Sequence, residues 1–470
     1  MRQTSLSDAT TDEGAELERL AEAAAALNRP GLPPKLSALR QTLYLKAKRE
    51  PAFRFYTVYG LIARLDVLEA AWALVAANDG APGVDGVTIA QIAAAPGGAA
   101  TLIATLHQEL QTKQYRPQAV RRVFIPKPNG KQRPLGIPTV RDRVVQTAAT
   151  LILGPIFEAD FQACSYAYRS GRSAQDAVRE VARGVKAGDT VVYDADLEAY
   201  FDSIPHDKLL QCVARRVADR SVLRLIRQWL TTPVEERDQD GRRRRRRPTQ
   251  GTPQGGVISP VLANLYLHWF DVVLHRRGGP AQWAGARLVR YADDFVILAK
   301  DIGPRLTTWV EATVEEWLGL TINRTKTRVV QLEPGEALDF LGYTFRYRPD
   351  QYGCVGRWYF TVEPSVGAVA RLRTKLRGLT ASRCGYRPVT QVIADVNRVL
   401  RGWGQYFQLG RPTPAYREIN AFVVRRIQCQ LRRRSQRRCR PPAGMTEYAF
   451  ITQQLGLMQL KPGARSAIAR

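Results

Sequence analysis

The most informative stretch is Leu288-Val289-Arg290-Tyr291-Ala292-Asp293-Asp294-Phe295-Val296-Ile297-Leu298. Apolar runs flank two adjacent acids, which predicts a β-hairpin with Asp293 and Asp294 at its tip. Adjacent carboxylates at a tight turn concentrate negative charge, and hard divalent cations with oxygen ligands are best suited to neutralise it. Taken alone, an Asp-Asp pair is usually an ordinary surface turn.

A second apolar run also leads into acids. Residues 190–193 (Thr-Val-Val-Tyr) predict a strand that continues into Asp194 and Asp196. Asp196 placed beside Asp293 and Asp294 would supply a third ligand for a pair of Mg²⁺ ions about 4 Å apart, the arrangement that promotes phosphoryl transfer. The two acid-bearing strands therefore predict a metal-dependent active site.

The composition indicates a polyanionic partner. The chain has 470 residues, which favours roughly two to three domains. Its 70 Lys and Arg outnumber 43 Asp and Glu, giving a formal charge of +27 that implies nucleic acid or an acidic membrane. Nucleic acid is favoured because no run of about 18 apolar residues offers a membrane helix. Without a secretory signal pattern at its start, the sequence favours a bacterial cytosolic or nucleoid location.

The cysteines and histidines argue against zinc. Six cysteines occur without any C-x₂₋₄-C pair, and every His lies before residue 276. Reduced thiols in or near the core are expected.

The chain predicts an α+β fold in three parts. Residues 1–115 are expected to form a helical N-terminal extension, residues 116–350 to mix strands with helices, and residues 351–470 to be helical and basic, with strands ending near residue 360. The run Arg242–Arg247 is expected to be a solvated or phosphate-contacting loop.

Seven segments in chain order resemble the motifs of the group II intron reverse transcriptases, and the resemblance covers nearly the whole chain. The segments are residues 123–138, 168–173, 190–202, 250–260 (Gln-Gly-Thr-Pro-Gln-Gly-Gly-Val-Ile-Ser-Pro), 291–294, 323–327 and 340–343. The resemblance implies a right-hand polymerase, with fingers and palm in residues 116–350 and a thumb or maturase domain after them. It also implies copying of RNA into DNA with two Mg²⁺ ions, with Mn²⁺ as an alternative.

The resemblance assigns roles to individual residues around the acids. Asp196 and Asp293 match the principal metal ligands, Asp294 the supporting acid, and Leu197 a neighbour in the metal-binding set. Phe201 matches an aromatic steric gate that excludes a ribose 2′-hydroxyl, although a core aromatic is the alternative. Further matches to the nucleotide site are Gln254, Lys127, Lys131, Arg133 and Lys326, among which Arg133 is the best candidate for gripping the triphosphate.

Other motif residues are expected to contact primer and template, or to be structural. Arg169 and Arg172 could reach template phosphate, and Phe340-Leu341-Gly342 resembles a primer grip, with a buried strand as the alternative. Ser173 and Asp176 form a capping box. His206, after a Pro turn, is expected to be hydrogen-bonded and structural, because two-metal transfer needs no His base.

The C-terminal part resembles the thumb or maturase domain of the same family. Trp403 and Phe407 are expected to fill its core. Phosphate binding is expected from its arginines, namely Arg401, Arg432, Arg433, Arg434, Arg437 and Arg438. Because no His follows His275, the HNH endonuclease of many relatives is expected to be missing.

Three functions remain open at this stage. The first is an intron-encoded reverse transcriptase and maturase, whose partners would be an RNA template, a DNA or RNA primer, dNTPs, group II intron RNA and target DNA. The second is a free-standing relative recruited to phage defence, spacer acquisition or DNA repair. The third is an RNA-binding splicing factor that no longer polymerises, against which the intact Asp196, Asp293, Asp294 and Gln254 argue.

Overall fold

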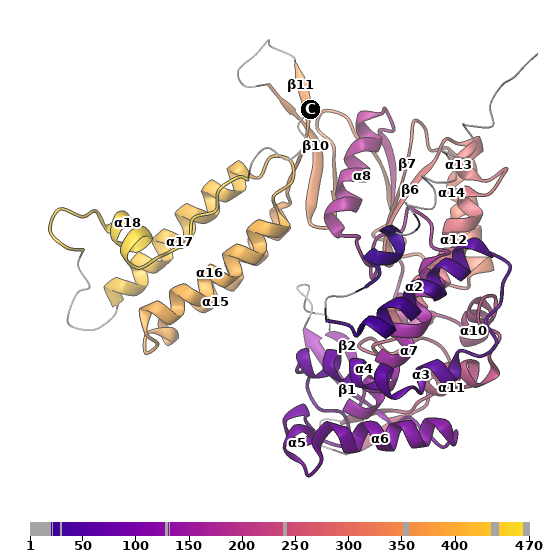
Figure 1. Cartoon of the computed structure of the whole chain (residues 1–470). Coiled ribbons are helices and arrows are strands. Elements are labelled where there is room, and N and C mark those ends of the chain that lie inside the picture. Colours follow the sequence, from indigo (N-terminus) through magenta and orange to yellow (C-terminus); the bar gives the residue numbers. More distant parts are fainter. Residues whose placement is uncertain are drawn as a thin grey trace, which may run out of the picture.

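The computed structural model describes residues 20, 22–28, 31–126, 130, 132–237, 242–350, 357–433 and 441–463. The α+β fold expected from the sequence is confirmed, with helices and three separate sheets in the described residues (Figure 1). None of the helices described is both long and apolar enough to cross a membrane.

The N-terminal helices share a core with the rest of the larger body. They are α2 (Pro34–Arg49), α3 (Tyr59–Ile62), α4 (Leu65–Ala77), α5 (Ile89–Ala94) and α6 (Gly98–Gln111). Leu36 on α2 and Leu68 on α4 are fully buried in the same cluster as Ile152 of the central helix α7 (Val140–Glu158). The N-terminal segment is therefore packed as part of this body.

The palm sheet has the strand order β6-β7-β3-β8 and is antiparallel throughout. Its strands are β3 (Val191–Ala195), β6 (Arg287–Tyr291), β7 (Asp294–Ala299) and β8 (Arg328–Gln331). Alternate residues of β7 enter different cores: Phe295 packs into one cluster, and Val296 into the other. Both faces of the sheet are covered, which explains why residues 295–299 are all apolar.

Helices surround this sheet. They are α8 (Ala174–Lys186), α9 (Tyr200–Ser203), α10 (His206–Ala214), α11 (Arg220–Leu230), α12 (Ser259–His275), α13 (Pro280–Trp283), α14 (Pro304–Glu311) and the π-helix η1 (Ala312–Trp317). The predicted capping box of α8 is confirmed: the Asp176 main-chain N–H donates to the Ser173 hydroxyl, and the Ser173 main-chain N–H donates to the Asp176 carboxylate.

A second sheet, of order β2-β1-β4-β5, corrects one prediction. It contains β1 (Val120–Pro126), β2 (Gln132–Ile137), β4 (Val234–Arg237) and β5 (Arg243–Arg246). The arginine run expected to be a loop is thus mostly an edge strand. Consecutive arginines tolerate a strand because neighbouring side chains point to opposite faces, and Glu235 of β4 forms ion pairs with Arg243 and Arg245.

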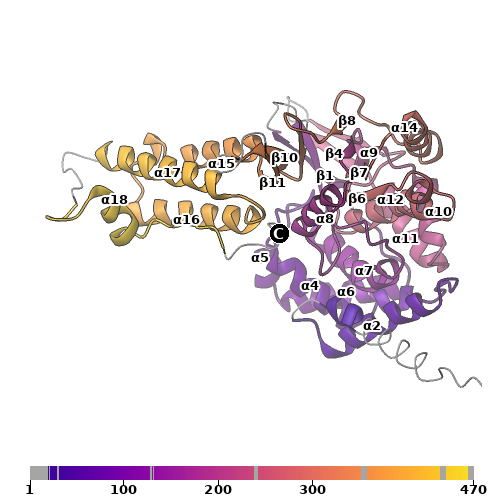
Figure 2. The same cartoon turned by 90° about the horizontal axis from the view of Figure 1, so that it is seen from above.

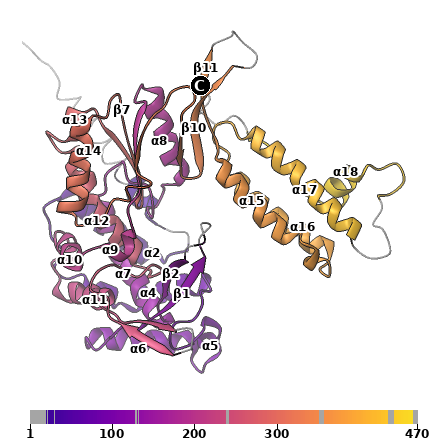
Figure 3. The same cartoon turned by 180° about the vertical axis from the view of Figure 1, so that it is seen from behind.

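The third sheet joins the body to a helical arm, as Figures 2 and 3 show. It contains β9 (Ala337–Phe340), β10 (Tyr343–Pro349) and β11 (Trp358–Pro364), in the order β11-β10-β9. The expectation that strands end near residue 360 is therefore wrong, because β11 continues to Pro364 through its pairing with β10. That pairing is not visible in the local sequence pattern.

The arm is helical from Val366 onward. Its elements are α15 (Val366–Leu379), the 3₁₀ turn η2 (Ser382–Cys384), α16 (Val389–Tyr406), α17 (Thr413–Arg433), α18 (Glu447–Ala449) and the π-helix η3 (Phe450–Gln454). These elements have a core of their own, in which Val396 of α16 and Ile419 of α17 are fully buried. In all three whole-chain views the arm projects away from the larger body (Figures 1, 2 and 3).

Candidate active site

The predicted acid hairpin is confirmed. β6 pairs antiparallel with β7, and Tyr291 lies opposite Asp294, so Ala292 and Asp293 form a two-residue turn. Ala292 has a φ of 60°, in the left-handed region that a residue with a Cβ atom rarely adopts. Backbone strain of this kind persists only where surrounding contacts hold it, and it is concentrated at functional sites.

Arg290 provides that support from beneath the turn. Its guanidinium is fully buried and makes five hydrogen bonds: two to Asp271 (2.8 and 2.5 Å), and one each to the Asn264 side chain (3.0 Å), the Ser165 hydroxyl (2.9 Å) and the Ala292 carbonyl (3.1 Å). All five guanidinium N–H groups are therefore satisfied. Burial alone would lower the pKa of Arg290, but the Asp271 carboxylate outweighs it and the pKa is raised.

The register of β3 brings the third acid to this turn. Ala195 of β3 pairs with Phe295 of β7, so the next residues, Asp196 and Asp294, lie at neighbouring positions on the two antiparallel segments. Asp194, two residues before Asp196, lies on the same face of the sheet. Leu197 is buried and forms an isolated β-bridge with Ile322, so its side chain cannot act as a ligand.

Burial and the charges of neighbouring acids raise the pKa values of the clustered carboxyl groups. Asp294 is exposed overall, but desolvation of its carboxyl group and the charges of Asp293, Asp196 and Asp194 raise its pKa to about 7. Desolvation followed by the charge of Asp196 raises the pKa of Asp293, while Arg133 acts in the opposite direction. Desolvation raises the pKa of Asp194 to about 6 against the opposing effect of Arg328. Desolvation is therefore the main cause of the raised pKa values, and the charges of neighbouring acids add to it.

The loop at residues 323–327 holds Asp196 and supplies a cation to it. The Asn323 main-chain N–H donates to the Asp196 carbonyl (2.8 Å), and the Asp196 N–H donates to the Thr327 hydroxyl (3.3 Å). The Lys326 ammonium lies 2.8 Å from the Asp196 carboxylate. Lys326 therefore lies in the site, where its charge also lowers the pKa of Asp294.

The donor set suits a hard divalent cation. Its members are carboxylates, which such ions prefer, and the charge of Asp196 adds to desolvation in raising the pKa values of Asp293 and Asp294. With side chains as they stand, the described residues contain no group of three or more His, Cys, Asp or Glu placed to hold a metal ion. Asp196 instead pairs with Lys326 through one carboxylate oxygen, Oδ2.

Phe201 lies on α9, which is hydrogen-bonded to the loop that contains Gln254. The Thr252 main-chain N–H donates to the Phe201 carbonyl (2.6 Å), and the Gly136 N–H of β2 donates to the Gln254 carbonyl (2.5 Å). Phe201 is half-buried, with its ring against the fully buried Tyr200. These bonds join the loop at residues 250–256 to α9 on one side and to β2 on the other.

Glycine permits this close approach. Gly255 has a φ of 110°, and a Cβ atom there would lie 2.4 Å from the Gly136 carbonyl oxygen. His206 accompanies the same loop, with its Nε2 atom 2.7 Å from the Gly251 carbonyl, so the predicted structural role of His206 is confirmed.

Arg133 is exposed on β2 and near enough to lower the pKa of Asp293. Lys127 and Lys131, the other predicted triphosphate contacts, lie outside the described residues.

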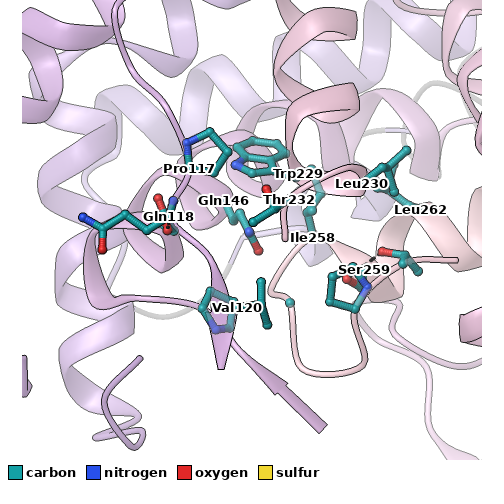
Figure 4. A pocket seen from close by; sticks show the side chains of 15 residues that line it. Pro117, Gln118, Val120, Gln146, Trp229, Leu230, Thr232, Ile258, Ser259 and Leu262 are labelled. Carbon is teal, nitrogen blue, oxygen red and sulfur yellow. Dashed lines mark hydrogen bonds between the residues drawn. The ribbon is translucent and has the colours of Figure 1, made fainter. Parts of the chain in front are cut away.

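A small pocket is lined in part by Thr252, Pro253 and Gly256 of the loop at residues 250–256 (Figure 4). Gln146 of α7 accepts a hydrogen bond from the Val257 N–H (2.9 Å), and Thr252 donates to Ser259 (2.8 Å). None of the three acids lines this pocket, so it is not the predicted metal site. The two hydrogen bonds fix the loop to α7 and to the start of α12.

The two predicted template arginines differ in their surroundings. The side chain of Arg169 is only 5% exposed and is held by Glu158 (2.7 Å) and by the carbonyls of Gln162 and Ser165. Its guanidinium is thus committed to the fold, which argues against contact with template phosphate in this conformation. Arg172 is half-buried and donates to the Ala163 carbonyl (2.6 Å).

Phe340, Leu341 and Gly342 lie at the β9–β10 hairpin. Phe340 pairs with Tyr343, and Leu341 and Gly342 form the turn with φ values of 50° and 79°. Phe340 is buried, as the buried-strand alternative required, while Leu341 is half-buried and its carbonyl accepts from the Tyr406 hydroxyl (3.0 Å). The turn is thereby fixed to the end of α16.

The arm carries the remaining predicted arginines. Arg401, Arg432 and Arg433 are exposed, and Arg432 lies 3.3 Å from Glu447. Arg434, Arg437 and Arg438 lie outside the described residues. Phe407 is buried in the core that contains Val192 and Val296, and Trp403 is half-buried between that core and the core of the arm, with its ring centroid 4.7 Å from that of Phe407. Both residues therefore pack in a core, but Phe407 lies outside the arm's own core, where it was predicted. Cys164, Cys212 and Cys429 are free thiols, while Cys354 and Cys439 lie outside the described part.

Several residues that shape the site were not predicted from the sequence. Arg290, Asp271 and Asn264 form the support beneath the turn. Tyr168 is 55% exposed and close enough to Asp293 for that carboxylate to raise its pKa, after desolvation, which is the larger cause. A charged residue inside an apolar strand was the available signal for Arg290, because burying a charge requires a partner.

Comparisons with known proteins agree with this geometry. Residues 125–345 match the family model described as reverse transcriptase (RNA-dependent DNA polymerase), and residues 369–443 match the model described as group II intron, maturase-specific domain. The fold is that of a right-hand polymerase, and the matched family is that of RNA-directed DNA polymerases. The chain belongs to the group II intron reverse transcriptases, with the maturase-specific domain that accompanies them.

Three relatives illustrate the similarity. Protein YkfC of Escherichia coli (strain K12) is 34% identical over 357 residues, covering 68% of this chain and 90% of that protein. The uncharacterized 91 kDa protein in cob intron of Schizosaccharomyces pombe is 26% identical, covering 69% and 47%. Group II intron-encoded protein LtrA of Lactococcus lactis subsp. cremoris is 37% identical, covering 35% and 26%. The chain thus spans most of the first relative and less than half of the other two.

The family assignment carries some general consequences. Reverse transcriptase domains generally use divalent metal ions, and the two matched domains imply an RNA template and intron RNA as partners. Which residues bind them is a separate question.

Proposed function

We propose that Asp196, Asp293 and Asp294 hold two Mg²⁺ ions at which this polymerase adds dNTPs to a primer. The observation that carries the proposal is the antiparallel register of β3 and β7, which places Asp196 beside the turn that bears Asp293 and Asp294. When bound, such ions activate the attacking 3′-hydroxyl and neutralise charge on the triphosphate. Leu197 could contribute only its main-chain carbonyl, because its side chain is apolar and buried.

The surrounding residues of the chain position the substrates. The charges of Arg133 on β2 and of Lys326 beside Asp196 act on the acids, and both residues suit the phosphates of an incoming dNTP. Gln254 is fixed between α9 and β2, where it can border the nucleotide. The turn at Leu341 and Gly342 is proposed to hold the primer end, and the exposed arginines of the arm to hold the template–primer duplex and intron RNA.

Phe201 tests the nucleotide part of this proposal. Replacing Phe201 with Val should increase incorporation of ribonucleotides relative to deoxynucleotides by about tenfold to a hundredfold, because the missing ring no longer excludes the 2′-hydroxyl. Single-nucleotide incorporation kinetics with matched rNTP and dNTP would measure the change. Leu210, a half-buried residue on α10 that packs against the same core, gives a control in Leu210→Val. Unchanged discrimination in Phe201→Val would reduce Phe201 to a core aromatic.

A second function, assistance to group II intron splicing and mobility, is favoured by the maturase-specific match at residues 369–443. It requires a basic surface for intron RNA, with target DNA as a further partner, and no metal-bound carboxylate. A splicing assay of the RNA that flanks the gene, at moderate Mg²⁺, tests it directly. Stimulation by the wild-type protein is expected. Its absence would favour a free-standing reverse transcriptase recruited to defence, spacer acquisition or repair.

A further inference from the structure

Strand β5 is an exposed arginine edge outside the site described above. It is the last strand of the β2-β1-β4-β5 sheet, and Arg243, Arg244, Arg245 and Arg246 are all exposed. Arg242 precedes the strand and Arg247 follows it, which makes six consecutive arginines. The catalytic acids lie on the separate palm sheet. We call β4 and β5 together the arginine hairpin.

The register of the arginine hairpin divides its arginines into two rows. Glu235 pairs across the strands with Arg245, and Glu236 pairs with Arg244. Glu235 is only 6% exposed, and it lies 2.8 Å from Arg245 and 3.6 Å from Arg243, so it anchors that row. The anchored side chains of Arg243 and Arg245 remain 59% and 65% exposed. They can therefore still bind an anion while Glu235 fixes where they stand.

The second row lies on the opposite face and contains Arg244 and Arg246. Both rows present guanidinium groups, whose planar donor pairs match phosphate oxygens in a bidentate manner. Within β4 and β5 no residue is aromatic. Proteins that bind single-stranded nucleic acid combine cations with aromatic platforms on which bases stack, whereas double-helical RNA is recognised by its shape and by contacts to its phosphates and 2′-hydroxyl groups. The arginine hairpin therefore fits a helical backbone better than a single strand.

We propose that the arginine hairpin binds the phosphate backbone of a double-helical RNA segment, at a surface separate from the polymerase site. RNA is chosen over DNA because an intron RNA is the structured polyanion that the maturase-specific domain implies. The proposal rests on the proposed function in this respect. It adds a second contact surface, on the sheet that also carries Arg133, so that folded RNA and the copied template are held at different places.

The test compares two double variants with equal charge loss. Arg244→Gln with Arg246→Gln removes one row of the arginine hairpin, and Arg276→Gln with Arg277→Gln removes two exposed charges that follow α12. Binding of a labelled RNA stem-loop is measured by fluorescence anisotropy across a salt series. The first variant should bind about tenfold more weakly at moderate salt, with a log–log salt slope shallower by about 2, whereas the second should stay within about twofold of wild type.

Two further comparisons make the outcome specific. Arg244→Lys with Arg246→Lys keeps the charge, so it should keep the wild-type salt slope; a slope as shallow as that of the Gln variant would overturn the role of charge. A DNA duplex of the same length should lose much less affinity than the RNA in the Gln variant. Equal losses would overturn the assignment to RNA, and an effect no larger than that of the α12 control would overturn the site itself.

Primer extension on a short RNA template at low salt separates this inference from the proposed function. The Gln variant of the arginine hairpin should extend the primer at the wild-type rate, because β5 lies at the opposite edge of its sheet from β2, which bears Arg133, and the acids lie on a different sheet. Wild-type protein that extends no primer would contradict the proposed function, whereas an unchanged salt slope in the Gln variant would contradict only the RNA-binding role of the arginine hairpin.

Discussion

The Asp293→Asn protein is expected to lose DNA synthesis on an RNA template by about a thousandfold or more. Asn keeps the shape of the side chain but removes the negative charge that would hold a metal ion at the tip of the β6–β7 hairpin. Loss of metal-based charge stabilisation costs several kcal/mol in the transition state, and each 1.4 kcal/mol is a factor of about ten in rate. Primer extension under single-turnover conditions measures the loss.

RNA binding by the same protein should be nearly unchanged. Affinity for RNA depends on cations, and Asp293→Asn removes none of them. Filter binding on the same preparation provides this comparison, and stimulation of intron splicing should likewise persist. Glu198→Gln is a matched control, because Glu198 is an exposed acid two residues after Asp196 and should tolerate the change. Synthesis near the wild-type rate by Asp293→Asn would remove Asp293 from the site.

Replacing Arg290 with Met is expected to destabilise the folded protein by about 3–5 kcal/mol. The change leaves the Asp271 carboxylate unpaired at a position that is 0% exposed, and an uncompensated buried charge carries a cost of about this size. It also frees the Asn264 side chain and the Ser165 hydroxyl of their shared donor. Urea unfolding followed by tryptophan fluorescence would show a lower midpoint.

The double variant Arg290→Met with Asp271→Leu distinguishes the cost of leaving one buried charge unpaired from the cost of losing the whole ion pair. Removing both charges should recover much of the lost stability, because a buried ion pair can often be replaced by apolar residues at little cost. Polymerase activity should remain low in the double variant, since the Ala292 carbonyl no longer has a donor to hold the strained turn. A single Arg290→Met variant that unfolds at the wild-type urea concentration would contradict the anchoring role.

Local patterns were sufficient to predict the acid hairpin, the α+β class and the capping box at Ser173. In each case the determining residues are neighbours in sequence: apolar runs around Asp293 and Asp294, and a Ser and an Asp three positions apart. A second apolar run that leads into acids added Asp196, which the β3–β7 register places beside them. The catalytic roles of Asp196, Asp293 and Asp294 stay predictions, because the family matches extend over whole segments and do not test single residues.

The features that sequence could not supply depend on distant partners. Arg290 contacts Asp271, 19 residues away, and Ser165, 125 residues away. The sequence predicted that Arg169 contacts template phosphate, but in the structure its guanidinium is bound to Glu158 and to two main-chain carbonyls. The arginine run became a strand because Glu235 on β4 offsets part of its charge. None of these pairings leaves a local period in the sequence.

The central claim is that Asp196, Asp293 and Asp294 hold the two divalent ions at which DNA is made. The most direct test is anomalous scattering from crystals of the protein with an RNA–DNA template–primer, a non-hydrolysable dNTP analogue and Mn²⁺. Two Mn²⁺ peaks bounded by Asp196 and Asp293 are expected. A bound analogue with no Mn²⁺ peak at these carboxylates would contradict the claim.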